Sequence, residues 1–200
     1  NPFRVKVLAD GRASFHRKNI AASIEIFKLA FVQGMAAELT IKSRNVSRYT
    51  DVAALLNDAA EADHRVRVLD GSMPHETLMS VIADHHVLLS PHRSEGFGIS
   101  LAEAMMLGTI AVATGWSGNT DFMNDTNSIL LPYKLDKIND PNGIYTTSSD
   151  EWASVDCAAS ADVLRRLSND HDRRAKLAAL AQSDIEKWIS TKPYQLALSS

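Results

Sequence analysis

The chain has 200 residues, of which 45% are hydrophobic, so it is long enough to bury a sizeable core. Its formal net charge of −3 at pH 7 argues against general affinity for nucleic acid or for anionic membranes. A single cysteine, Cys157, excludes a disulfide framework and a cysteine-based zinc site and predicts a reducing cytoplasm, and we expect neither a membrane span nor a secretory signal.

Short β-branched runs alternate with amphipathic segments over the first two thirds of the chain. Residues 3–10 predict a strand, and 18–33 predict a helix because apolar residues recur at helical spacing from Ile20 onward. The further strands are expected over 37–43, 65–71, 86–91, 109–114 and 128–133, and the further helices over 51–62, 74–84, 100–107 and 161–189, the last with a break near 169–172.

Strand alternating with helix at this pitch predicts an α/β fold, a doubly wound, Rossmann-like parallel sheet with right-handed crossovers. Residues 134–152 interrupt the alternation; they are polar and turn-rich, and we interpret them as a surface loop. No second core is indicated, so residues 1–200 are expected to form a single domain. Because the chain begins with Asn1 rather than methionine, we expect it to be a piece of a longer polypeptide with a further, partner domain.

Ligands of open α/β sheets bind beyond the carboxyl ends of the strands, where the strand order switches. Gly96 and Gly98 stand just before a predicted helix, where backbone N–H groups and the helix dipole favour phosphate. The spacing matches neither a Walker loop nor the dinucleotide fingerprint. The loops that this geometry selects are 10–19, 43–48, 70–73, 90–98 and 114–119.

Two carboxylates accompany these glycines. Glu95 is either an ordinary exposed loop acid or a fixed acceptor for sugar hydroxyls. Glu103 either forms a capping box with Ser100 or binds a ligand.

The stretch SEGFGISLAEAMMLGTIAVATGWSGNTDFM resembles the signature region of the retaining GT-B glycosyltransferases of family 4 (group 1), which use nucleotide sugars. Their E-x7-E element falls on Glu95 and Glu103, and a G-x-x-V-x-A-T strand and a G-G/S-x-x-E/D turn follow. The stretch HRKNIAASIEIFKLAF is similar to the family's first helix, which opens with a lysine of the donor site. The resemblance covers roughly residues 3–190 and implies the C-terminal, donor-binding half of the enzyme.

The resemblance implies a role for each matching residue. Glu95 would bind hydroxyls of the donor hexose near C3 and C4, Glu103 would bind the ribose hydroxyls, and Lys18 would neutralise the leaving diphosphate. Backbone groups would hold the sugar and the diphosphate at Gly96, Phe97, Gly98, Ile99 and Ser100.

One departure concerns the second cation of the diphosphate site. The family places an arginine five residues before the lysine, whereas Arg12 is six residues before Lys18. Related sequences offer a serine instead, here Ser14, so both residues are candidates. We interpret Arg17 as a solvated neighbour.

Other candidates and decoys lie elsewhere in the chain. Met73 is either a contact of the nucleotide or part of the core, and His92 is either a contact near the sugar or a structural residue. Residues 170–172 read D-H-D, which we interpret as a helix-initiating turn rather than a metal site, and the histidines at 85–86 are expected to be ordinary.

The resemblance implies a hexosyltransferase that moves sugar from a UDP- or GDP-sugar to a glycan or other hydroxyl acceptor, in bacterial surface polysaccharide synthesis. The alternative is a nucleotide-sugar-binding module with no transfer activity in isolation. We expect no cofactor and no metal in this domain. The expected partners are the donor, a glycan acceptor and an N-terminal acceptor domain of the same parent chain, without nucleic acid and with peripheral membrane association through the missing part. The expected location is the cytoplasm, with the inner face of the membrane as a further expectation.

Overall fold

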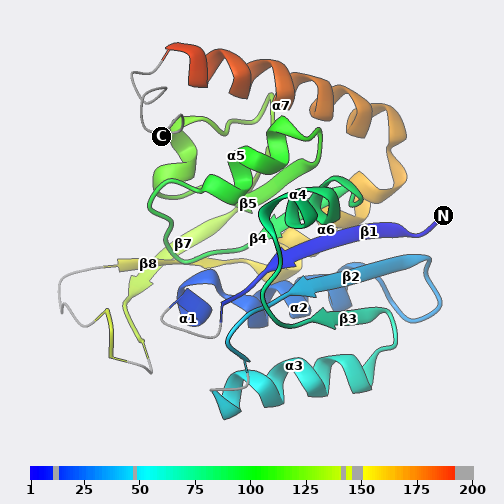
Figure 1. Ribbon diagram of the computed structural model, residues 1–200, viewed down its shortest axis with the longest axis vertical. Helices are drawn as coiled ribbons and strands as arrows, with labels where there is room; N and C mark the ends of the chain where they lie inside the picture. Colours follow the sequence, from blue (N-terminus) through cyan, green and yellow to red (C-terminus); the bar gives the residue numbers. More distant parts are fainter. Residues whose placement is uncertain (11–13, 47–48, 141–142, 146–150, 192–200) are drawn as a thin grey trace.

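Six strands pair in parallel to form the central sheet, in the order β3-β2-β1-β4-β5-β6 (Figure 1). The computed structural model describes residues 1–10, 14–46, 49–140, 143–145 and 151–191. The strands are β1 (Phe3–Leu8), β2 (Ala37–Lys42), β3 (Val66–Leu69), β4 (Val87–Ser90), β5 (Ile110–Thr114) and β6 (Ile129–Leu131). The predicted Rossmann-like α/β class is therefore confirmed.

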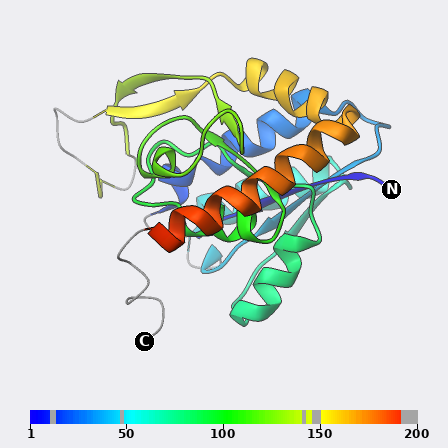
Figure 2. The same cartoon turned by 90° about the horizontal axis from the view of Figure 1, so that it is seen from above.

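Helices cover both faces of this sheet (Figure 2). One face packs on α1 (Ser14–Lys18), α2 (Ile20–Ala30), α3 (Thr50–Ala62) and α6 (Cys157–Asn169). The other face packs on α4 (His75–Ala83), α5 (Ile99–Met106) and most of α7 (His171–Thr191). Because both faces are covered, central strands read as apolar runs, and all five residues of β5 are buried.

The segment 134–152, which the sequence predicted to be a surface loop, contains a β-hairpin instead. Strands β7 (Tyr133–Lys137) and β8 (Glu151–Val155) pair antiparallel as a second, two-stranded sheet. All five residues of β7 are exposed, and its two apolar residues, Tyr133 and Leu135, alternate with polar ones over too short a run to mark a strand in the sequence. The hairpin is anchored through β8, where Trp152 and Ala153 are buried.

The break in the C-terminal helical segment is confirmed at Asp170, between the end of α6 and the start of α7. The Asp170 carboxylate accepts a hydrogen bond from the Arg173 N–H at 2.9 Å, so residues 170–172 start a helix as expected. None of the helices within the described residues is long and apolar enough to cross a membrane.

Candidate active site

The strand order switches between β1 and β4, which are neighbours in the sheet but lead to strands on opposite sides. The chain leaves β1 toward α1 and leaves β4 toward the loop 91–98, so both segments meet at the carboxyl edge of the sheet. A small hollow at this edge is lined by Lys18, Ser90 and Ser100 together with apolar residues of β1 and β4. The structure therefore brings two of the selected segments, 10–19 and 90–98, together at the predicted place.

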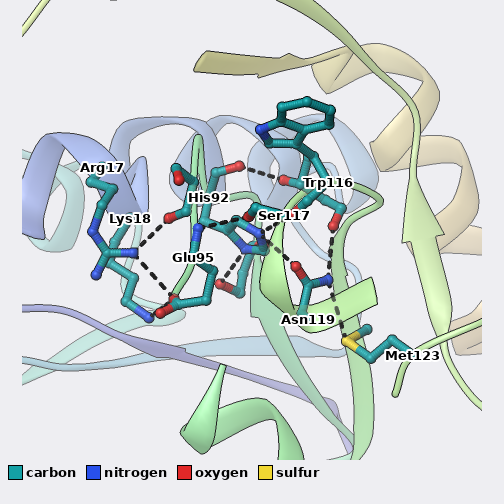
Figure 3. Close-up of polar contacts among 11 residues, drawn as sticks. Arg17, Lys18, His92, Glu95, Trp116, Ser117, Asn119 and Met123 are labelled. Carbon is teal, nitrogen blue, oxygen red and sulfur yellow. Dashed lines mark hydrogen bonds and ion pairs between the residues drawn. The ribbon is translucent and has the colours of Figure 1, made fainter. Parts of the chain in front are cut away.

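Glu95 is the centre of an ion cluster at this switch point (Figure 3). Its Oε2 atom contacts the Lys18 Nζ and lies 3.4 Å from the Arg17 Nη1. Arg17 also donates a hydrogen bond to the Ser94 carbonyl at 2.5 Å. Only 17% of the Arg17 side chain is exposed, so the interpretation of Arg17 as a solvated neighbour was wrong. Packing of α1 on the loop after β4 turns its side chain inward.

The charges around Glu95 favour its ionised form. Burial alone would raise the pKa of this carboxyl, because 11% of the side chain is exposed. The charge and hydrogen bond of Lys18, followed by the charge of Arg17, outweigh burial and hold the Glu95 pKa below its ordinary value. Glu95 is therefore ionised at neutral pH and can only accept hydrogen bonds.

The turn after β5 fixes the backbone of Glu95 from the other side. The Glu95 N–H donates to the Ser117 Oγ at 2.8 Å, and the Gly118 N–H donates to the Glu95 carbonyl at 3.0 Å. Ser117 has a φ of 71°, a strained value for a residue with a side chain. The turn at 116–119 thus clamps the loop that carries the carboxylate.

His92 lies beneath this clamp and is completely buried. Its Nε2 faces two acceptors, the Trp116 carbonyl at 3.2 Å and the Asn119 Oδ1 at 3.1 Å, so we assign the ring proton to Nε2. Its Nδ1 then accepts from the Ser90 hydroxyl at 3.2 Å. Burial lowers the pKa of His92 and favours this neutral ring. Both ring nitrogens are used inside the protein, which favours the structural role for His92 over a sugar contact.

Helix α5 begins where the loop ends. Gly98 is its N-cap residue with a φ of 93°, and no side chain caps the helix, so the capping box of Ser100 and Glu103 was wrong. The Leu101 and Ala102 N–H groups bond the Gly98 carbonyl. The N–H groups of Ile99 and Ser100 precede these donors and lie at the positive end of the helix, where an anion is favoured.

The remaining candidates are Phe97, Met73, Arg12 and Ser14. The Phe97 ring packs 5.1 Å from Phe122 and 5.3 Å from Trp188, so this residue offers its backbone rather than its side chain. Met73 is half-buried in the loop between β3 and α4. Arg12 lies outside the described residues, and so does the side chain of Ser14 at the start of α1.

Glu103 projects from α5 toward α4, where its Oε1 lies 3.7 Å from the Nε2 of His75. Its side chain is 23% exposed. Burial raises the pKa of Glu103 above its ordinary value, and the charge of the nearby His75 offsets this rise only in part. Glu103 is thus free of the helix cap and available as an acceptor.

The loop also rests on the hairpin that the sequence reading missed. The Arg93 carbonyl accepts from the Ala153 N–H of β8 at 2.9 Å, and the Arg93 N–H donates to the Arg17 carbonyl at 2.8 Å. The Arg93 guanidinium lies over the Trp152 ring, 5.8 Å from its centroid. No motif marks these contacts, because they join segments about 60 to 76 residues apart in the chain.

Other residues that position the site could be anticipated from the sequence. Ser117 and Asn119 belong to the loop 114–119 that the strand pattern had selected, and Arg17 adjoins the candidate Lys18. Their hydrogen-bond roles, however, depend on the approach of neighbouring loops.

Comparisons with known proteins identify the family of the chain. The family model described as "Glycosyl transferases group 1" matches residues 4–140, which is more than half of the chain. The chain belongs to this family. A search of curated protein sequences found no significant match to this chain.

Solved structures match this group 1 glycosyltransferase chain at the level of fold. The C-terminal domain of LpcC, a group 1 glycosyltransferase from Francisella tularensis, superposes with a TM-score of 0.69 at 14% identity, over 95% of this chain and 87% of that one. Anabaena HepE, solved with UDP-glucose, has a TM-score of 0.69 at 17% identity, over 94% of this chain. WaaG, a glycosyltransferase of lipopolysaccharide biosynthesis, has a TM-score of 0.63 at 18% identity, over 94% of this chain. The chain spans 44% of HepE and 43% of WaaG.

Proposed function

We propose that this chain is the donor-binding part of a retaining glycosyltransferase. The enzyme would transfer a hexose from a UDP- or GDP-sugar to a glycan or other hydroxyl acceptor in bacterial surface polysaccharide synthesis. The observation that carries the proposal is the contact between Lys18 and Glu95 across the switch point of the sheet. In this proposal Lys18 would neutralise the leaving diphosphate, and the ionised Glu95 beside it would accept hydrogen bonds from sugar hydroxyls.

The parts of the donor follow from this placement. The diphosphate would lie between Lys18 and the start of α5, where the Ile99 and Ser100 N–H groups add positive potential. The hexose would lie against the loop at Gly96, with its hydroxyls on Glu95. Glu103, further along α5, would accept hydrogen bonds from the ribose hydroxyls.

The chemistry is a substitution at the anomeric carbon. The bond from this carbon to the diphosphate oxygen breaks, and the acceptor oxygen forms its bond on the same face. The proton of the acceptor hydroxyl passes to the departing phosphate, and Lys18 stabilises the negative charge that develops there. In this scheme Glu95 binds the sugar and does not act as a nucleophile, and no metal ion is needed.

The named neighbours support the donor class. HepE was solved with UDP-glucose, and WaaG acts in lipopolysaccharide biosynthesis. We propose that the rest of the parent chain supplies an N-terminal acceptor domain and any peripheral contact with the inner face of the membrane, and that the reaction occurs in the cytoplasm.

Calorimetric titration of the chain with UDP and with GDP, each with and without magnesium, tests the proposal. We expect one nucleotide to bind without magnesium, and Glu103→Ala to weaken this binding about tenfold by removing an acceptor for ribose. Glu61→Ala, at an exposed position of α3, is the matched control and should bind like the wild type. Failure of both nucleotides to bind would refute the proposed site.

The alternative, a binding module without transfer activity, makes the same binding prediction. It is separated by assaying the complete parent protein with the nucleotide sugar and following the anomeric configuration of the product by NMR. Retained configuration supports the transferase, whereas binding without turnover supports the module.

A further inference from the structure

In the proposed function, two anions compete for the ammonium group of Lys18. Its Nζ contacts the Glu95 Oε2, and in the proposed function the same group neutralises the leaving diphosphate. Electrostatic attraction to a diphosphate weakens the hold of Lys18 on the carboxylate, because one compact ammonium cannot make its best contact with both anions. Glu95 therefore needs a second cation if it is to stay in place.

Arg17 is the residue placed to meet this need. Its Nη1 lies 3.4 Å from the Glu95 Oε2 and donates to the Ser94 carbonyl at 2.5 Å. One guanidinium thus holds both the backbone before Glu95 and its carboxylate, and the planar fork of arginine suits such a double contact. The Arg17 carbonyl also accepts from the Arg93 N–H, so α1 and the loop are joined by backbone as well.

We propose that Arg17 is a positioning residue that holds the Glu95 carboxylate toward the donor sugar while Lys18 serves the diphosphate. The proposal rests on the proposed function and adds a division of labour between adjacent cations. Arg17 acts through Glu95 and does not itself touch the donor.

The charges that face Glu95 come from helix α1, which supplies Arg17 and Lys18. The loop itself supplies one titratable group, His92, whose buried ring is neutral. The turn after β5 contributes the uncharged hydroxyl of Ser117. If Lys18 turns to a bound diphosphate, Arg17 becomes the main charge that keeps the Glu95 pKa low.

Carboxyl carbon NMR of the glutamate-labelled chain tests this directly, with the Glu95 signal assigned by its loss in Glu95→Gln. The Glu95 pKa is measured with and without saturating UDP or GDP, whichever binds, in the wild type and in Arg17→Gln. Removal of the Arg17 charge should raise this pKa by about 1 when nucleotide is bound, and by less without nucleotide.

Further variants separate charge from structure. Arg17→Lys keeps the charge and should keep the pKa close to that of the wild type. Arg67→Met removes an exposed arginine of the edge strand β3 and should leave it unchanged. Arg17→Met replaces Arg17→Gln if the latter does not fold.

The outcomes distinguish the two proposals. If nucleotide binds but the Glu95 pKa is the same in the wild type and in Arg17→Gln, the role of Arg17 is overturned while the proposed function stands. If the Glu95 pKa rises as much in Arg17→Lys as in Arg17→Gln, the role of Arg17 is also overturned, because its charge would then have no effect on Glu95. Absence of binding to the wild type refutes the proposed function and, with it, this inference.

Discussion

Gly118 lies against the backbone of Gly96 so closely that a Cβ at position 118 would stand 1.9 Å from the Gly96 carbonyl oxygen. No heavy-atom contact of this kind is tolerated, and the obstacle is backbone rather than a flexible side chain. The small residue at 118 therefore allows the turn after β5 to clamp the loop of Glu95.

Gly118→Ala should push this loop away from the turn. We expect the free energy of unfolding to fall by about 1–3 kcal/mol, as in other overpacked sites, and nucleotide affinity to fall with it. Urea denaturation and calorimetric titration measure the two effects. Gly96→Ala is the control for stability, because a Cβ there meets nothing within 4 Å; equal stability of both variants would contradict the clamp.

Asn119 is completely buried and joins the clamp to His92. Its Nδ2 donates to the Thr114 carbonyl at 3.0 Å, and its Oδ1 accepts from the His92 Nε2 at 3.1 Å. Asn119→Ala removes the side-chain donor to the buried Thr114 carbonyl and one of the two acceptors of the His92 Nε2, and it should cost about 2 kcal/mol in urea denaturation. Asn57→Ala, on the exposed side of α3, should cost nothing measurable. A neutral Asn119→Ala would mean that His92 finds other partners.

Asp63 and Arg65 form a buried ion pair with a 2.7 Å contact, with exposed side-chain fractions of 6% and 7%. Arg65 also donates to the Phe31 and Val32 carbonyls at the end of α2. Asp63→Asn leaves the guanidinium without its counter-charge and should cost about 3 kcal/mol at pH 7. Asp162→Asn, in an exposed pair with Arg165, should cost less than about 1 kcal/mol.

The same pair predicts a pH dependence. The hydrogen bonds from Arg65 hold the Asp63 pKa below its ordinary value despite burial. The folded protein thus binds a proton at Asp63 less readily than the unfolded chain, so the stabilisation is present above the unfolded pKa of about 4 and is lost as pH falls toward the folded pKa. Urea denaturation between pH 7 and pH 3 should show a shallower loss in Asp63→Asn. Parallel curves would contradict the assignment.

Lys6 of β1 is completely buried, and its Nζ has no hydrogen-bond partner among the described residues. Burial, with a smaller effect of Lys42, lowers its pKa from 10.5 to about 8. Between these values the unfolded chain binds more protons, so the free energy of unfolding should rise with pH from about 8 to 10.5. Below pH 8 the penalty is fully present.

Lys6→Met should therefore stabilise the protein at pH 7, by at most about 3 kcal/mol, and abolish the rise at alkaline pH. Lys134→Met, at a position with 76% of the side chain exposed, is the control and should do neither. A destabilised Lys6→Met would show that the ammonium is compensated by groups beyond hydrogen-bonding distance.

Local patterns in the chain predicted the parallel sheet and its helices, because residues buried on both faces leave apolar runs and 3.6-residue repeats. The same patterns failed for the hairpin of β7 and β8. Every β7 residue is exposed, and its antiparallel pairing with β8 is what makes it a strand. They also failed at α5, where the N-cap residue is Gly98 rather than Ser100.

The sequence by itself determined the fold class, the family and the choice of Lys18, Glu95 and Glu103 as candidate residues, since these depend on spacing along the chain. Only the tertiary structure decided what holds those residues. Arg17 faces inward because α1 packs on the loop after β4, and His92 is engaged because the turn at 116–119 closes over it. Contacts between segments distant in the chain are set by strand order and packing, which no local pattern encodes.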